Sequence, residues 1–184
     1  MKQILVTTIL LALFSCTNTS NTEYSTLRVD ANLKSKFFAS TKTMLNPLTI
    51  KTKNGYDGLI DSTEYQINSN ILVNNDSLRS IRFTKLKRIS NDTLRLSIYE
   101  TNPMYHHNLI ASIIGTSFKI TYDFDMSGPS IDPNIKTITQ ELILKSLPNK
   151  KGDSVYGYLN YLGKCNFDCD GEIKIKGYFK TKLD

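Results

Sequence analysis

The stretch "LRLSIY", Leu94–Tyr99, decides the fold class of this 184-residue chain. Large aliphatic residues occupy every second position, and polar or amphipathic residues stand between them. In an extended strand this alternation places the two kinds of side chain on opposite faces. The pattern is therefore typical of a β-strand with one face in the core and one in solvent. It recurs in "SFKITYDF", Ser117–Phe124, and in "EIKIKGYF", Glu172–Phe179.

Similar runs cover most of the chain, and short turn-forming pairs such as Asn54-Gly55 separate them. These further candidate strands are Pro47–Lys53, Thr63–Val73, Ser80–Ile89, Asn108–Ile114, Lys136–Leu147 and Ser154–Leu162. Connections this short join antiparallel neighbours, because a parallel crossover needs about a dozen residues or more. The sequence predicts an all-β fold, a mainly antiparallel β-sandwich, with a β-barrel as the alternative.

One segment, Asp30–Met44, departs from the alternating pattern. Asp30 is a suitable helix N-cap because its carboxylate accepts hydrogen bonds from backbone amides of a first turn. Apolar residues follow at helix-like spacing: Leu33, Phe37, Phe38 and Leu45. We therefore expect one short N-terminal helix beside the β-structure.

The start of the chain has the pattern of an export signal. Lys2 precedes the apolar run Ile4–Phe14, which is shorter than the roughly 20 residues of a membrane-spanning helix. The run ends in Leu13-Phe14-Ser15-Cys16, which resembles the lipobox of bacterial lipoproteins. The resemblance covers residues 1–16 and implies that signal peptide 1–15 is removed and that the Cys16 sulfur carries a diacylglyceryl group. Plain secretion, with Cys16 unmodified, is the alternative.

A flexible tether is expected between the lipid and the folded part. Residues 16–29 include few side chains able to form a core, which leaves 30–184 as a single β-domain. Thr17 is not the aspartate that retains many such lipoproteins at the inner membrane. The resemblance therefore implies a protein anchored by lipid in the bacterial outer membrane, facing either the periplasm or the outside.

The chain is basic, with a formal net charge of +6 at pH 7. A positive balance is found in nucleic-acid-binding proteins, but export separates the chain from nucleic acid, and the lysines are scattered along the sequence. The expected partners are the membrane, through the lipid anchor, and a glycan or protein ligand. No nucleic acid and no cofactor are expected.

Two cysteines remain once Cys16 is lipidated, and they lie in an oxidising compartment. Cys165 and Cys169 are close enough in sequence for a short disulfide. An extended strand would hold their Cα atoms more than about 7 Å apart, so the disulfide requires a turn or bulge in "CNFDC". Two free thiols are the alternative.

The same segment resembles the start of an EF-hand calcium loop. Asn166, Asp168 and Asp170 have the alternating spacing of oxygen ligands, and Gly171 follows them. The twelfth position is Gly177, where a calcium loop has a bidentate glutamate, and the alternating run after Gly171 indicates a strand. A turn between two strands is therefore favoured, with a metal site at Asn166, Asp168 and Asp170 as the alternative.

No catalytic residue is predicted. His106 and His107 are adjacent, so in an extended segment their imidazoles point to opposite faces and would seldom bind one ion. Gly152-Asp153-Ser154-Val155 resembles the nucleophile block of the GDSL esterases. In that family the base follows the serine, whereas both histidines here precede Ser154.

Tyr156 and Tyr158 are candidate ligand-binding residues. They share one face of the predicted strand Ser154–Leu162, and Gly157 on the other face is expected to let a second backbone approach. If the pair is exposed, the two rings form a surface for stacking. The alternative is that this face packs in the core.

These observations predict a non-catalytic, lipid-anchored envelope protein that presents a binding surface. The alternatives are an immunity or inhibitor lipoprotein acting on a protein partner, and an envelope hydrolase. The segments "GDSVYGYLNYLGKC" (152–165) and "IKIKGYFK" (173–180) resemble the closing strands of uncharacterised bacterial lipoproteins. That resemblance implies no particular activity.

Overall fold

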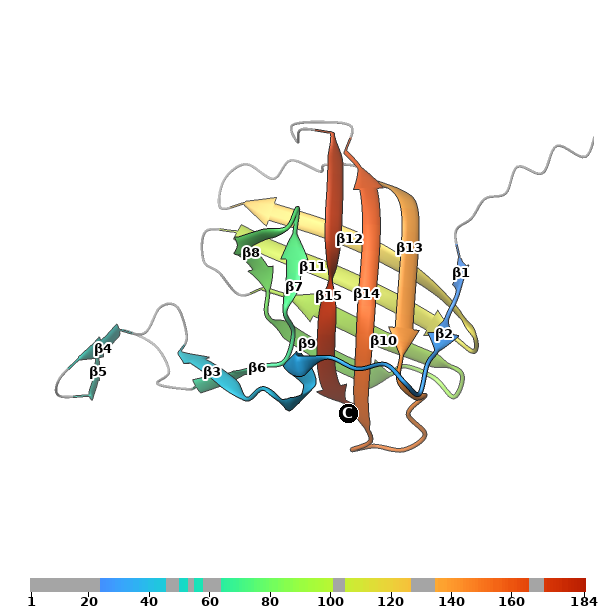
Figure 1. Ribbon diagram of the computed structural model, residues 1–184, viewed down its shortest axis with the longest axis horizontal. Coiled ribbons are helices and arrows are strands. Elements are labelled where there is room, and N and C mark those ends of the chain that lie inside the picture. Colours follow the sequence, from blue (N-terminus) through green and yellow to red (C-terminus); the bar gives the residue numbers. More distant parts are fainter. Residues whose placement is uncertain are drawn as a thin grey trace, which may run out of the picture.

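The computed structural model describes residues 24–45, 50–52, 55–57, 64–100, 105–126, 135–165 and 171–184. Two β-sheets pack face to face, and the strands of one cross those of the other steeply (Figure 1). The predicted β-sandwich is therefore confirmed, and the described strands do not close into the alternative barrel.

The first sheet has five strands, all antiparallel. Its order is β1 (Ser25–Thr26), β12 (Ser117–Met126), β11 (Tyr105–Ile114), β10 (Thr93–Tyr99) and β9 (Phe83–Arg88). Strand β10 contains the stretch Leu94–Tyr99. Leu94, Leu96 and Ile98 are buried as the alternation predicts, whereas Arg95 between them is exposed.

The second sheet has six strands, antiparallel except for the pair β2–β13. Its order is β2 (Arg28–Val29), β13 (Lys136–Leu144), β14 (Ser154–Lys164), β15 (Glu172–Lys182), β7 (Ile71–Val73) and β8 (Asp76–Ile81). Two small two-stranded sheets complete the described structure. They are β3 (Lys42–Leu45) with β6 (Glu64–Ile67), and β4 (Ile50–Thr52) with β5 (Gly55–Asp57).

The core lies between the two large sheets and consists mainly of leucine and isoleucine. Phe179 of β15 is fully buried there and faces Gly157 of β14 across the strand pair. A Cβ at Gly157 would lie 2.2 Å from Phe179 Cζ, so the missing side chain makes room for the ring. The predicted close approach at Gly157 is thus made by an aromatic ring and not by a second backbone.

The chain passes from one sheet to the other at two points. At Leu27 it leaves the five-stranded sheet after β1 and enters the six-stranded sheet as β2. At Arg82 it leaves the six-stranded sheet after β8 and enters the five-stranded sheet as β9. The predicted strand Ser80–Ile89 is therefore two strands in different sheets.

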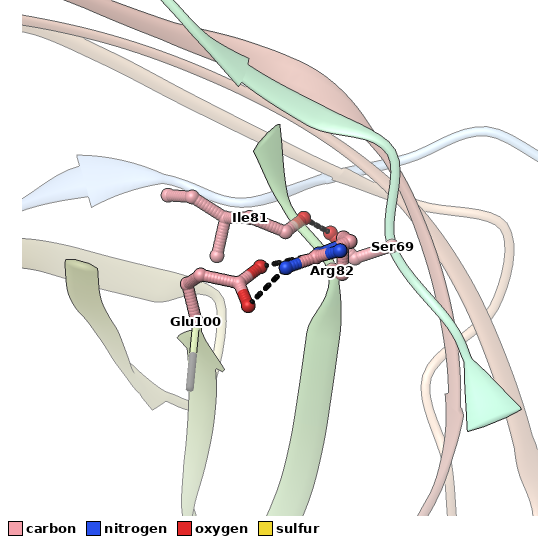
Figure 2. Close-up of polar contacts among 4 residues, drawn as sticks. All are labelled: Ser69, Ile81, Arg82 and Glu100. Carbon is pink, nitrogen blue, oxygen red and sulfur yellow. Dashed lines mark hydrogen bonds and ion pairs between the residues drawn. The ribbon is translucent and has the colours of Figure 1, made fainter. Parts of the chain in front are cut away.

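The crossing at Arg82 carries an ion pair between the partly exposed Arg82 and the buried Glu100 (Figure 2). Arg82 donates from Nε to Glu100 Oε2 at 2.8 Å and from Nη2 to Glu100 Oε1 at 2.7 Å. The Glu100 side chain is 0% exposed. Ser69 Oγ donates to the carbonyl of Ile81 beside the pair, so polar groups surround the point where the strand changes sheets.

The expected helix over Asp30–Met44 is not formed. One turn of 3-10 helix, η2 (Lys36–Ala39), is present, and Ser35 caps it by accepting from the Phe37 amide at 3.2 Å. Residues 42–45 pair with β6 as strand β3, since this threonine-containing segment suits an extended conformation. Among the described residues, no helix is long and apolar enough to cross a membrane.

The folded structure begins before the expected tether boundary at Asp30. Ser25–Val29, assigned from sequence to the tether, form β1 and β2 and pair with both large sheets. Leu27 between them is only 7% exposed and joins the core. The signal peptide and Cys16 lie outside the described residues.

Candidate functional site

The outer face of the six-stranded sheet carries a row of lysines on β15. The sequence alternates so that Ile173, Ile175 and Phe179 are buried. The residues between them point outward, and four of these are lysines: Lys174, Lys176, Lys180 and Lys182. Alternation in one strand thus places four ammonium groups along one line of the surface.

Three tyrosines lie beside this row. Tyr156 and Tyr158 of β14 point outward and are half-buried, and Tyr178 of β15 is directly opposite Tyr158. The ring centroids of Tyr158 and Tyr178 are 5.0 Å apart, a distance typical of packed aromatic pairs. We call the surface formed by these tyrosines and the four lysines the basic–aromatic face.

The η2 turn packs against one end of the basic–aromatic face. The Phe38 ring lies 5.0 Å from the Tyr156 centroid and meets Tyr178 edge-on at 5.7 Å. Lys180 Nζ donates to the carbonyls of Phe38 (3.4 Å) and Ser40, and lies 5.4 Å from the Phe37 centroid. Lys180 therefore fixes η2 on the sheet, while the other three lysines remain exposed.

Two open grooves flank η2. The first, of about 400 Å³, is lined by Phe38, Gln66, Asn68, Ser154, Tyr156, Lys180, Thr181 and Lys182. The second, of about 420 Å³, is more apolar and is lined by Lys36, Phe37, Ser40, Lys42, Ile67, Ser69, Asn70, Leu72, Ser80 and Arg82. The first groove is lined partly by residues of the basic–aromatic face, so this face is grooved as well as positively charged.

Few carboxylates oppose the lysines among the described residues of this face. Glu172 lies 3.6 Å from Lys174, and Glu141 lies 3.4 Å from Arg28 on the neighbouring edge. Partial burial and then the Glu141 charge raise the pKa of Tyr158. Tyr158 therefore stays a neutral phenol and a hydrogen-bond donor at physiological pH.

The predicted ligand residues Tyr156 and Tyr158 are brought together on the outer face of the sheet. They do not pack in the main core, which was the alternative interpretation. The lysine row and the place of Phe38 on this face were not predicted from the sequence. The alternation of lysine in "KIKGYFKTK" was the available signal for the row, but the sequence did not identify β14 as its neighbour.

The two histidines point to opposite faces of β11, as their adjacency predicts. His106 is exposed, whereas His107 is 3% exposed and lies between the sheets. His107 Nδ1 and the Tyr122 hydroxyl share a hydrogen bond of 2.7 Å, and the imidazole stacks on Phe124 at 4.8 Å. Burial, and then the positive charge of Arg79, lower the pKa of His107 to about 4.

Ser154 is not placed to use either histidine as a base. It lies at the start of β14 on the outer face of the six-stranded sheet and lines the first groove. His107 lies on the other side of that sheet, in the interior, and His106 belongs to the outer surface of the five-stranded sheet. The arrangement expected of an esterase is therefore not built around Ser154.

The remaining predicted site residues fall largely outside the described chain. Cys165 is buried and disulfide-bonded, but Cys16 and Cys169 are not described, so the Cys165–Cys169 pairing stays a prediction. Asn166, Asp168 and Asp170 also lie outside the described residues. Strand β15 begins at Glu172, directly after Gly171, as the turn interpretation predicts. Within the described ranges, no group of three or more histidine, cysteine or acidic side chains is arranged to hold a metal ion.

Comparisons with known proteins give no match to this chain. No family model, no curated protein and no solved structure is significantly similar to it. The interpretation of the basic–aromatic face therefore depends on its own geometry and charge.

Proposed function

We propose that this chain is a non-catalytic, lipid-anchored protein of the bacterial outer membrane that binds an anionic glycan through the basic–aromatic face. The observation that carries the proposal is the gathering of four lysines and three tyrosines on one side of the β14–β15 pair. Lysine ammonium groups attract carboxylate or sulfate groups, and tyrosine rings stack on the apolar faces of sugar rings.

The shape of the face favours an extended ligand over a small molecule. Both grooves beside η2 are open, whereas small-molecule sites bury most of the ligand. The exposed Lys174 and Lys176 occupy adjacent outward positions of β15, about 6.6 Å apart, and Lys182 lies about 20 Å beyond Lys176. Repeated charges at such intervals suit a polymer that carries acidic groups along its length.

The proposed lipid at Cys16 gives this face its location. A diacylglyceryl group with a further acyl chain is a lasting anchor, because one chain alone holds a protein only marginally. The anchor keeps the face close to the polymers of the envelope. Replacing Cys16 by serine should abolish lipid-dependent processing and move the protein from the detergent phase to the aqueous phase.

Binding to polygalacturonate, with neutral dextran as the comparison, tests the ligand class. We expect the full chain to bind the acidic polymer, to lose affinity as salt rises, and to ignore dextran. Lys176→Gln and Tyr158→Ala should each weaken binding by roughly two- to fivefold, as expected for a lost charge contact or stacking surface.

Lys87→Gln is the matched control, because Lys87 is exposed on β9 of the other sheet. Equal binding by Lys87→Gln, Lys176→Gln and the unsubstituted protein would refute the proposal. Capture of an acidic protein that competes for Lys176 and excludes the glycan would replace it with the inhibitor interpretation.

A further inference from the structure

Three strand connections meet at one corner of the sandwich, at the lower right of Figure 1. They are residues 89–92 between β9 and β10, 115–116 between β11 and β12, and 145–153 between β13 and β14. The Gly115 amide donates to the Asp92 carbonyl at 3.1 Å, which joins the first two connections. Arg88 Nη2 donates to the carbonyls of Pro148 and Asn149, both at 3.3 Å, which joins the first to the third. The corner is therefore one surface and not three independent loops.

Large aliphatic side chains are exposed on this corner. They are Val29 (51% exposed), Ile89 (57%), Ile114 (40%) and Leu147 (42%). These are four of the eight large hydrophobic residues exposed within the described ranges. Ile89 and Leu147 belong to the connections, whereas Ile114 and Val29 end β11 and β2 beside them. Isolated exposed aliphatics are ordinary, but a group in and next to adjoining connections indicates a surface that contacts an apolar partner.

Cations lie on and beside the 145–153 connection. Lys150 and Lys151 are exposed at the tip of the 145–153 connection, and Arg88 lies at its base. The side-chain carboxylates of the three connections accept hydrogen bonds within their own turns, and Asp184 beside them pairs with Lys85. Asp92 accepts from the hydroxyls of Ser90 and Thr93, and Asp153 accepts from the amides of Asn149 and Lys150. Apolar tips edged by lysine are typical of surfaces that enter the headgroup region of a bilayer.

The N-terminal end of the described structure lies near this corner, which also favours a bilayer as its partner. Ser25 and Thr26 pair with Phe118 and Ser117, and the Leu27 amide donates to the Thr116 carbonyl at 2.8 Å, inside the corner. Tyr24 is thus about 10 Å from the corner at 3.3 Å per residue. The eight residue steps from Cys16 to Tyr24 span at most about 29 Å. A lipid at Cys16 therefore holds this corner within reach of the bilayer surface.

We infer that this corner rests on the bilayer that carries the anchor, with Ile89, Ile114 and Leu147 in the headgroup region and Lys150 and Lys151 against acidic lipid headgroups. The inference rests on the proposed lipid anchor. It adds an orientation: the basic–aromatic face begins beside the corner, where Lys145 Nζ lies 5.9 Å from the Tyr156 ring centroid, and runs along β14 and β15 away from it, so its Lys174 and Lys176 end stays open to the envelope polymer.

Tryptophan substitutions test this contact directly, because the chain has no tryptophan of its own. The lipidated full chain is reconstituted in vesicles of phosphatidylethanolamine and phosphatidylglycerol, with or without lipids brominated on their acyl chains. Ile114→Trp and Leu147→Trp place the probe at the corner. Leu78→Trp is the control, since Leu78 is 82% exposed on β8, at the opposite edge of the six-stranded sheet.

We expect brominated lipid to quench the two corner probes by roughly twofold and to leave the Leu78→Trp emission unchanged. Equal quenching at all three positions, in protein that still floats with the vesicles, would overturn the bilayer contact while leaving the anchor intact. A corner probe that is shielded from water but insensitive to bromine would also overturn it, in favour of a protein contact. If the lipidated preparation floats no better than its Cys16→Ser variant, the anchor itself fails, and the orientation fails with it.

Discussion

The chain crosses between the two sheets at Leu27 and at Arg82, and the first crossing is packed by an apolar side chain whereas the second has an ion pair. At the first crossing, the apolar Leu27 side chain is buried in the core. The backbone amides of Leu27 and Asp30 donate to the carbonyls of Thr116 and Leu144. At the second crossing, Arg82 forms its ion pair with the buried Glu100. The Arg82 carbonyl accepts from the backbone amides of Asn68 and Ser69, both at 3.0 Å.

The two crossings differ in the groups that lie close enough to form hydrogen bonds with the backbone. Leu27 lies near the chain entry, where main-chain hydrogen bonds to two neighbouring strands are available. At Arg82 the chain passes from β8 to β9, the edge strands on the other side of the two sheets, and the carbonyls of Ile81 and Arg82 accept hydrogen bonds from another segment. The segment 68–70 supplies donors. Ser69 Oγ donates to the Ile81 carbonyl, and the side-chain amide of Asn68 donates to the Thr84 carbonyl at 2.8 Å. Both crossings therefore join edge strands, and they differ in their partners: the Leu27 crossing uses backbone hydrogen bonds to its neighbours, whereas the Arg82 crossing also takes side-chain partners from distant segments.

Among substitutions at the two crossings, removal of the Glu100 carboxylate should lower the free energy of unfolding most. Glu100→Ala leaves the Arg82 guanidinium without its bidentate partner in a site that excludes water from the carboxylate, so we expect a loss of about 4 kcal/mol in the free energy of unfolding. Urea denaturation followed by circular dichroism measures it.

The double variant Arg82→Met/Glu100→Leu is the matched control. It removes both charges, and we expect it to recover at least half of the stability lost in Glu100→Ala, because an apolar pair of similar size has no charge to desolvate. If the double variant is less stable than Glu100→Ala, the ion pair is not the source of the effect.

Truncation of Leu27 should have the next largest effect. Leu27→Ala removes a buried side chain at the apolar crossing and leaves a cavity, so we expect a loss of about 3 kcal/mol. Leu27→Met, which keeps most of the volume, should lose less than about 1.5 kcal/mol. Equal losses for alanine and methionine would show that side-chain volume does not stabilise this crossing.

Acid should destabilise the protein through His107, a buried polar group at neither crossing. Because the pKa of His107 is lowered to about 4 in the fold from an unfolded value of 6.5, the unfolded chain binds the proton first as pH falls. Stability from this residue is present above pH 6.5 and lost between pH 6.5 and 4, by about 2 kcal/mol at pH 5.

Chemical denaturation at pH 7 and pH 5 measures this loss. His107→Phe should flatten the pH dependence, since phenylalanine does not titrate, whereas His106→Gln, which leaves His107 in place, should keep it. A His107→Phe protein that loses as much stability in acid as the unsubstituted chain would contradict the assignment.

Removal of the Ser69 hydroxyl is expected to have the smallest effect. Ser69→Ala takes one donor from the Ile81 carbonyl while leaving the backbone hydrogen bond to Arg82 in place, and we expect a loss of about 1 kcal/mol. Combined with Glu100→Ala, its effect should differ from the sum of the two separate losses, because both act on one polar network. Strict additivity in denaturation experiments would show that the two interactions are independent.

Only part of the basic–aromatic face could be predicted from the sequence. Tyr156 and Tyr158 were expected to share a face because they stand two residues apart in a strand. Their neighbours Tyr178 and Lys180 lie about 20 residues further along, and only the β14–β15 register places them alongside. Phe38 belongs to a segment expected to form a helix, so its contact with Tyr156 could not be anticipated.

Local alternation in the sequence determined that this chain is a β-protein, which side chains of β10 and β15 face the core, and where several turns fall. These properties depend on neighbours a few residues apart, and the period of two records them directly. The tertiary structure decided where the sheets divide. Ile81 and Phe83 are both buried on either side of Arg82, so the alternation continues unbroken through the crossing and nothing in the sequence marks it. Only the packing of Ser69 and Glu100 against that point makes the change of sheet possible, because the carbonyls and the guanidinium exposed by the crossing need partners from distant segments.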